Sequence, residues 1–275
     1  MIFGLTPMNV LEINFYTTYM HFSRKPSPSQ RSDAAFMSYA ELTYRSHNPL
    51  KRLVQGNRYQ AMLRLIDPAS PVSVLDYGCG DGFFLSLLRD KGVPHDRLTG
   101  FEPFGSMAAQ FPTGSGCPDL IDNADHLGTL AGRHFSYIFC MEVLEHLDDA
   151  DIGTALDRIA ALASPDTWII VTVPSELGLA GAVKCLFRRT RGTEEVSWAT
   201  IRSVLFSRPP ARLVSDTAEG PYIYSHIGFD HRRLEARLAE RFRIVRRIGV
   251  PFSRLPIAIN NEVAFLCRLF PDAEP

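Results

Sequence analysis

The 275-residue sequence contains few cysteines, and their spacing suggests neither a disulfide framework nor a metal knuckle. The five cysteines stand at positions 79, 117, 140, 185 and 267, so that they form no CxxC pair and are odd in number. Disulfide-rich domains and zinc knuckles need closely spaced cysteine pairs. The pattern therefore argues against both and favours a protein of the reducing cytoplasm.

Long hydrophobic runs and an excess of one charge are also absent. No apolar run reaches the roughly 18 residues that a membrane-spanning helix needs. The N-terminal stretch MIFGLTPMNVLEINFYTTYM lacks the basic start of a signal peptide. The formal net charge of −1 makes nucleic acid an unexpected partner, because bulk electrostatics would not hold it. With 45% hydrophobic and 21% charged residues, the chain has the composition of a folded globular protein.

Changes in composition divide the chain into three parts. Residues 1–33 end in the Ser- and Pro-rich stretch SRKPSPSQRSD and are expected to form a flexible tail. Residues 34–70 carry apolar side chains at three- and four-residue steps and are expected to form a helical cover. Residues 71–275 are expected to form the main domain, with an insertion at about 175–224.

The alternation of patterns in residues 71–275 predicts an α/β fold. Strands are expected in SVLDY, RLTGFEPF, PDLIDN, FSYIFCM and TWIIVTVP, and helices in DGFFLSLLRDKG and DIGTALDRIAALAS. The helix DHRRLEARLAERF precedes two further strands, FRIVRRIGV and NNEVAFLCRLF. Strands that alternate with helices form a mostly parallel sheet covered on both faces. The last two strands lack a helix between them and are expected to be antiparallel.

Three glycines mark the turn between the first strand and the following helix. VLDYGCGDGFFL places Gly78, Gly80 and Gly82 there, where backbone amides can approach a ligand and the helix N-terminus adds positive partial charge. A dinucleotide-binding loop would need its third glycine one residue later. Two carboxylates, Asp76 and Asp81, flank the loop. They would repel a pyrophosphate but attract an ammonium group, so a nicotinamide cofactor is disfavoured.

A further carboxylate follows the next strand. Glu102, in TGFEP, lies about 20 residues beyond the glycines, where an acidic residue accepts hydrogen bonds from ribose hydroxyls. A loop that suits an amino-acid-like cation, together with an acid that suits a ribose, predicts S-adenosylmethionine as the ligand.

The chain resembles class I S-adenosylmethionine-dependent methyltransferases over residues 71–270. VLDYGCGDGFFL resembles the first motif of that family, GFEP the second, FSYIFCMEVLEHL the fourth, and TWIIVTVPSELG the strand beyond. The resemblance implies a Rossmann-like, seven-stranded, mostly parallel sheet with an antiparallel last strand. This agrees with the pattern read from the residues.

The same motifs imply which residues contact the cofactor. The implied set is Asp76, Gly78, Cys79, Gly80, Glu102, Pro103, Asn123, Ala124 and Met141. The first four would hold the methionine end, and Glu102 would hold the ribose. Asn123 and Ala124 are expected at the adenine, with Asp122 or Asp125 as alternatives. The strand that ends at Met141 is expected to finish beside the sulfonium.

The segment EVLEH brings three more polar side chains to the end of a strand. If a helix starts there, Glu142, Glu145 and His146 share one face, because residues three and four apart are neighbours on a helix. Two carboxylates and an imidazole could hold a divalent metal. They could equally form a general base with its orienting partner.

The EVLEH segment also resembles a pattern in two metal-using branches of the family. In terminal 2′-O-methyltransferases of small RNAs, an ExxEH segment and a later histidine hold magnesium. Ubiquinone-pathway O-methyltransferases carry a similar EVxEH segment and act on catechols. The later histidine here is His226, with His231 as the weaker candidate. The implied Mg²⁺ ligands are Glu142, Glu145, His146 and His226. Metal-free catalysis by Glu142, His146 and His226 is the favoured alternative, and purely structural roles are the third.

The insertion at about 175–224 contains LAGAVKCLFRRTR and VSWATIRSVLFSRPPARLV, both apolar and basic at helical spacing. It follows the C-terminal end of a strand, the edge at which open α/β sheets bind ligands, so a substrate lid is favoured over packing against the N-terminal helices. For its apolar face, packing inside the protein is favoured over contact with an anionic membrane.

The expected function is therefore methyl transfer from S-adenosylmethionine to a hydroxyl of a small molecule, sugar or lipid precursor. Alternatives are metal-assisted methylation of vicinal hydroxyls, including a catechol or an RNA 3′ end, and N-methylation. A non-catalytic cofactor-binding module is the alternative from another class of protein.

Overall fold

The structure is a computed structural model that describes residues 49–66, 72–192, 194–217 and 220–271. The expected flexible tail, residues 1–33, lies outside the described residues, as do residues 34–48 of the expected helical cover. None of the described helices is long and apolar enough to cross a bilayer.

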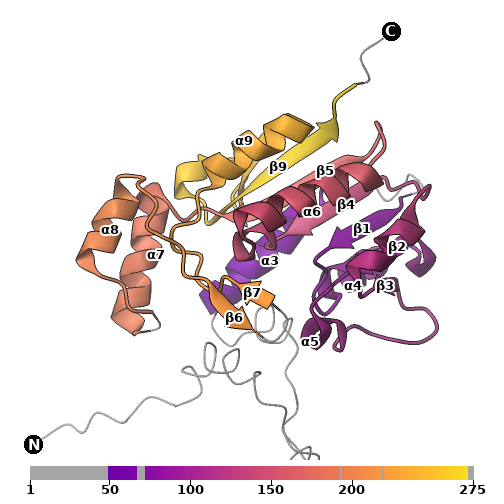
Figure 1. Ribbon diagram of the computed structural model, residues 1–275, viewed down its shortest axis with the longest axis horizontal. Coiled ribbons are helices and arrows are strands. Elements are labelled where there is room, and N and C mark those ends of the chain that lie inside the picture. The colour runs from indigo at the N-terminus through magenta and orange to yellow at the C-terminus, as the bar shows by residue number, and fades with distance from the viewer. Residues whose placement is uncertain (1–48, 67–71, 193, 218–219, 272–275) are drawn as a thin grey trace, which may run out of the picture.

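A seven-stranded sheet forms the centre of the molecule (Figure 1). Its strands are β1 (Val74–Tyr77), β2 (Leu98–Phe101), β3 (Asp119–Ile121), β4 (Tyr137–Met141), β5 (Trp168–Pro174), β8 (Phe242–Val250) and β9 (Glu262–Leu269). They lie in the order β3-β2-β1-β4-β5-β9-β8, with β1 to β5 parallel. Strand β9 is antiparallel to both of its neighbours. The predicted Rossmann-like sheet with an antiparallel last strand is confirmed.

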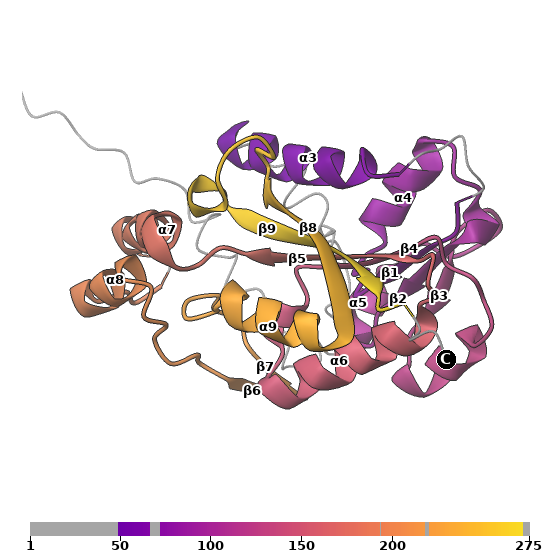
Figure 2. The same ribbon diagram turned by 90° about the horizontal axis from the view of Figure 1, so that it is seen from above.

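Helices cover both faces of this sheet, which gives three layers (Figure 2). On one face lie α3 (Pro49–Leu63) and α4 (Phe83–Asp90), and on the other lie α6 (Asp149–Leu162) and α9 (His231–Arg241). Short helical segments complete the connections: η3 (His95–Arg97), α5 (Gly105–Ala108), η4 (Ala124–Leu130), η5 (Leu144–His146) and η6 (Ile257–Ile259).

Side chains that point alternately to the two faces of the central strands fill the two cores that these helices cover. In β4, Ile138 and Cys140 enter the core beneath α6 and α9, whereas Phe139 enters the core beneath α3 and α4. All three side chains are fully buried, as expected for a strand inside a sheet with two covered faces. From α3, Met62 is also fully buried in the second core. The described part of the helical cover thus belongs to the main hydrophobic core.

The insertion between β5 and α9 contains two helices and a hairpin. Helices α7 (Gly178–Arg191) and α8 (Trp198–Leu205) pack on each other beyond the carboxyl end of β5, outside the three layers (Figure 1). The hairpin follows as β6 (Ser215–Thr217) and β7 (Gly220–Tyr222).

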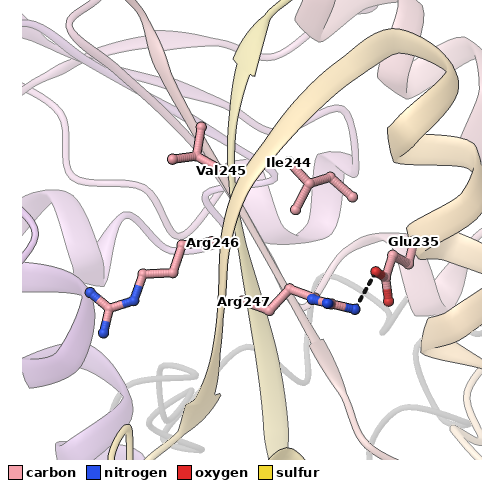
Figure 3. Close-up of a pocket in the computed structure, with 5 residues that line it drawn as sticks. All are labelled: Glu235, Ile244, Val245, Arg246 and Arg247. Atoms are coloured by element: carbon pink, nitrogen blue, oxygen red, sulfur yellow. Dashed lines mark hydrogen bonds and ion pairs between the residues drawn. The ribbon is translucent and has the colours of Figure 1, made fainter.

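The outer edge of the sheet is β8, whose pairing with β9 shifts register between Ile244 and Arg246. Figure 3 shows the result: Val245 and Arg246 lie on one side of the strand, and Ile244 and Arg247 on the other. The guanidinium of Arg247 binds the Glu235 carboxylate at 2.6 Å. A bulge and exposed arginines protect a sheet edge from pairing with another chain. The hollow beside these residues contains none of the predicted site residues.

Candidate functional site

The carboxyl ends of the parallel strands gather the predicted site residues at one edge of the sheet. Asp76 lies near the end of β1, Glu102 directly follows β2, and Met141 ends β4. Asn123 and Ala124 follow β3 at the start of η4. Because parallel strands end at the same edge, segments far apart in the sequence meet there.

The glycine loop after β1 is held by backbone hydrogen bonds to β2. The amides of Gly78 and Cys79 both donate to the Phe101 carbonyl oxygen, at 2.7 and 3.0 Å. Gly78 adopts a φ of 83°, and a side chain there would also collide with Val143. The loop therefore needs glycine at this position for both its conformation and its close packing.

Three carboxyl groups surround this loop. Glu102 accepts hydrogen bonds from the amides of Gly80 at 2.9 Å and Phe104 at 3.0 Å, which fixes its side chain. Asp76 is 3% exposed, and its burial, with the charges of Glu102 and Asp81, raises its pKa to about 8. Such a site is electrostatically unfavourable until a cation enters it, so it suits a ligand with an ammonium or sulfonium group.

The remaining residues of the implied cofactor set surround this region. Asn123 is exposed, and its side-chain oxygen accepts a hydrogen bond from the Asp125 amide at 2.9 Å, so that it caps η4. Ala124 and Met141 are half-buried, whereas Pro103 is exposed. Their places at the ends of β2, β3 and β4 are compatible with the roles that the motifs imply.

The EVLEH segment does not begin a helix. Glu142 has a positive φ of 55°, residues Leu144–His146 form the single turn η5, and α6 begins only at Asp149. Asp148 caps α6 by accepting hydrogen bonds from two backbone amides, each at 2.8 Å. The expectation that Glu142, Glu145 and His146 share one helix face is therefore wrong. The strained backbone at Glu142 places this residue outside any helix.

Glu142 binds a residue that the motifs did not suggest. Arg58, from α3, donates to the Glu142 carboxylate at 3.1 Å and also binds the fully buried Glu262 of β9. Burial raises the pKa of Glu142 to about 7, although Arg58 opposes the rise. Glu142 therefore changes its charge near neutral pH.

Glu145 lies deeper than Glu142. Its side chain is fully buried, and no N–H group within the described parts of the chain donates to either of its oxygens. Burial first, and then the charge of Glu142, raise its pKa well above the usual range. Because the charges of the two carboxyl groups repel each other, they do not both ionise readily, and the deeper Glu145 is the one that stays protonated.

His146 and His226 meet from opposite sides of the site. The Nε2 atoms of their rings are 3.4 Å apart, and His146 Nδ1 is 2.8 Å from the Ile223 carbonyl oxygen. A carbonyl can only accept, so Nδ1 of His146 carries the hydrogen, and its Nε2 carries a lone pair that faces Nε2 of His226. Burial lowers the pKa of His146 to about 4. Burial and then His146 lower that of His226 to about 3, so both rings are neutral at neutral pH.

Aromatic rings connect this pair to the glycine loop. Tyr222, at the end of β7, stacks on the ring of His146 with 4.8 Å between centroids. Its ring also contacts those of Phe104, which is close to Glu102, and Tyr224, at 5.2 and 4.7 Å between centroids. The insertion thus contributes a wall of the site through its hairpin.

Three donor groups in the site are close enough to bind one ion. Ligand atoms of Glu145, His146 and His226 all lie within 4.8 Å of one another, and Glu142 is not part of this group. His231 is placed at the start of α9 and does not belong to it either. Mg²⁺ prefers oxygen ligands, whereas two imidazoles and one carboxylate suit zinc, iron or manganese better. The residues therefore do not fit the implied magnesium.

Charged residues at the start of the insertion form a network that the sequence did not predict. Lys184 donates to Glu176, to the Ser175 carbonyl and to the Asn261 carbonyl, at 2.8 to 3.0 Å. Arg188 also binds Glu176, at 2.6 Å. Burial opposes ionisation of Glu176, but the two cations lower its pKa to about 2. A lone glutamate followed by basic residues at helical spacing was the only sequence signal for this network.

Known protein families provide an independent comparison. A family described as a methyltransferase domain matches residues 47–212, which is more than half of the chain. Among curated proteins, the ubiquinone biosynthesis O-methyltransferase of Paracidovorax citrulli is 27% identical over 142 residues, or 47% of this chain and 59% of that protein. The protein of the same name from Thiobacillus denitrificans is 26% identical over 177 residues, or 59% of this chain and 74% of that protein. The first match thus spans less than two thirds of its relative.

Solved structures share the fold at low sequence identity. The PH0226 protein from Pyrococcus horikoshii matches with a TM-score of 0.53 and 13% identity, over 82% of this chain and 98% of that one. An overlap of this extent at such low identity supports the architecture alone.

Proposed function

This chain belongs to the methyltransferase domain family, and on that premise we propose that it is a class I S-adenosylmethionine-dependent enzyme that methylates a hydroxyl oxygen of a small molecule. The lone pair on His146 Nε2, fixed by the hydrogen bond from Nδ1 to the Ile223 carbonyl, is the observation that carries this proposal. Two curated relatives named as O-methyltransferases support oxygen as the acceptor atom. A sugar or lipid precursor would satisfy the same chemistry.

The glycine loop and its carboxyl groups would hold the cofactor. Gly80 has no side chain to block its approach, Asp76 would pair with its ammonium group, and Glu102 retains lone pairs for ribose hydroxyls. S-adenosylmethionine supplies the methyl group when it is bound. The residues of the chain must then place and deprotonate the acceptor.

His146 is positioned to do this. Its Nε2 can accept a hydrogen bond from an acceptor hydroxyl, which aligns the oxygen and receives its proton as the new bond forms. His226, whose Nε2 lies 3.4 Å from that of His146, would lie beside the hydroxyl. Tyr222 holds the His146 ring in its orientation by stacking on it. A neutral imidazole is required for this role, and burial provides it.

Glu142 is the second group that can take the proton. Its pKa of about 7 is better matched to neutral pH than that of His146, and it follows the last residue of β4. The two assignments predict different dependence on pH. A reaction that needs ionised Glu142 loses rate below about pH 7, whereas a reaction that needs only neutral His146 keeps its rate down to about pH 4.

The test is consumption of S-adenosylmethionine against a panel of phenols, catechols, sugars and amines. With a hydroxyl acceptor, His146→Ala should lower kcat by about 10²- to 10⁴-fold, the usual contribution of a positioned base. His95→Ala is the matched control, since His95 is exposed in η3 before β2, at the opposite edge of the sheet. Glu142→Gln should remove the loss of rate below neutral pH if Glu142 is the base. Turnover of amines alone, unaffected by His146→Ala, would contradict the proposal and favour N-methylation.

A second candidate is metal-assisted methylation of vicinal hydroxyls, as in a catechol. Only the grouping of Glu145, His146 and His226 favours it, and these donors suit Zn²⁺ or Mn²⁺. A titration of the protein with each ion, read by calorimetry in the absence of cofactor, tests this candidate. Binding that His226→Ala abolishes and His95→Ala preserves would support it.

A further inference from the structure

Helix α7 presents large apolar side chains to solvent. Leu179, Val183, Leu186 and Phe187 recur at four-, three- and one-residue steps, so they share one helix face. Their exposed fractions are 59, 60, 43 and 53%. The expectation that this apolar face packs inside the protein is wrong.

The packing of α7 onto α8 uses a different face, made of small residues. Gly181, Ala182 and Cys185 are buried against Val204 of α8. A side chain at Gly181 would collide with the backbone of Glu176. Internal packing of α7 is therefore already complete without its large apolar side chains, and their outward position needs another explanation.

Arginines accompany the aromatic members of this surface. The Arg191 guanidinium lies over the Phe187 ring at 4.4 Å, and that of Arg189 lies over Trp198 at 5.0 Å, with Trp198 itself 64% exposed. Residues 177–214 contain seven basic and two acidic side chains, a net charge of +5 in a chain whose total is −1. The exposed apolar side chains thus lie in a segment with a net positive charge.

We propose that the α7–α8 surface, defined by Leu179, Val183, Leu186, Phe187, Trp198 and Arg191, docks onto an anionic lipid bilayer. Apolar side chains that enter the acyl boundary, bordered by arginines that contact anionic headgroups, are the combination that holds a helix in the plane of a membrane. Tryptophan beside arginine is also typical of the membrane interface.

Charge argues against two other occupants of this surface. A second copy of the chain would place the same arginines opposite one another in a symmetric contact, which is unfavourable. Residues 1–48 carry four basic and three acidic side chains, so they offer no net negative charge to match the surface. An anionic bilayer provides both the charge and the apolar layer.

Co-sedimentation of the full chain with vesicles tests the proposal. Binding is expected to vesicles of phosphatidylcholine with one part in about three of phosphatidylglycerol, and it should weaken with added salt. Pure phosphatidylcholine should bind much less. Brominated lipids should quench fluorescence in the native protein but not in Trp198→Ala, whose remaining Trp168 lies in β5.

Matched variants distinguish binding through this surface from non-specific binding to the vesicles. Val183→Ser combined with Phe187→Ser should reduce vesicle affinity at least tenfold, because both apolar groups leave the bilayer. Arg191→Gln should reduce it about fivefold, the usual effect of one basic residue near an anionic membrane. Val245→Ser and Arg246→Gln, changes at exposed positions on β8, should leave affinity unchanged.

Three results would overturn the proposal. The first is no binding to anionic vesicles, and the second is binding that the α7 variants do not reduce. The third is a dimer in sedimentation velocity that Val183→Ser with Phe187→Ser dissociates, since the surface would then be an interface between copies. If the protein binds polyglutamate but not vesicles, the partner of this surface is an acidic protein and not a bilayer. None of these measurements needs turnover, so they are independent of the acceptor.

Discussion

Binding of the cofactor should release a proton from Asp76. The pKa of this buried carboxyl is about 8, so at about pH 7 roughly ten molecules are protonated for each one that is ionised. Pairing with the ammonium group of the ligand needs the ionised form. Affinity for S-adenosylhomocysteine should therefore increase nearly tenfold per pH unit between about pH 5.5 and about pH 7.5.

Calorimetry in two buffers with different ionisation enthalpies measures this directly. At about pH 7 the native protein should release about 0.9 protons per ligand bound, the protonated fraction set by a pKa of about 8. Asp76→Asn should abolish the proton release and flatten the dependence on pH. Asp90→Asn, a change at an exposed carboxylate in α4, should preserve both. Equal affinity at every pH in the native protein would refute the assignment of Asp76 to the ammonium group.

The same raised pKa affects the stability of the protein without ligand. The folded state binds the Asp76 proton more tightly than the unfolded state, where the pKa has its usual value of 3.8. The contribution of Asp76 to the free energy of unfolding is therefore greatest below about pH 4. It decreases as pH rises toward about 8, the reverse of a carboxylate in an ion pair. Thermal melting measured across this pH range should show a melting temperature that falls as pH rises in the native protein. The fall should be smaller in Asp76→Asn.

Further substitutions test the contacts that support the site. Gly78→Ala should lower the free energy of unfolding by about 1–3 kcal/mol and abolish cofactor binding, because a positive φ and a collision with Val143 both oppose a side chain. Arg58→Met leaves two buried carboxylates without their cation and should cost about 3–5 kcal/mol in urea unfolding. Arg89→Met, at an exposed pair, should cost less than about 1 kcal/mol, and equal effects would contradict the role of Arg58. Asp148→Ala removes the cap of α6 and should cost about 1 kcal/mol by the same measurement.

Patterns of hydrophobicity were sufficient to predict the sheet. Strand β4 illustrates why: FSYIFCM has apolar side chains on both faces, which only a strand covered by two layers needs. The order of the strands followed from the resemblance to a family and not from these local patterns. Hydrophobic spacing also predicted α7, but it did not predict which of its two apolar faces packs. Small residues at Gly181 and Cys185 decided this, because they allow close approach to α8.

The contacts of the site were less predictable because they join distant segments. Glu142 meets Arg58, 84 residues away, and His146 meets His226, 80 residues away. Spacing within EVLEH suggested a helix, but spacing takes no account of the positive φ of Glu142, which tertiary contacts impose. For the same reason the sequence grouped Glu142 with the imidazoles, whereas the structure pairs it with arginine.

The acidic side chains of this site divide into two electrostatic groups with different requirements. Asp76 and Glu102 adjoin the glycine loop, where burial keeps a negative charge unfavourable until a cation arrives. Glu142 already has a cation in Arg58, so its charge depends on pH near neutrality and not on the ligand. Binding of a cationic cofactor should consequently change the protonation of the first group far more than that of the second. An enzyme arranged this way separates cofactor binding from deprotonation of the acceptor. Asp76→Asn should then affect mainly affinity for the cofactor, and Glu142→Gln mainly the rate once both substrates are bound.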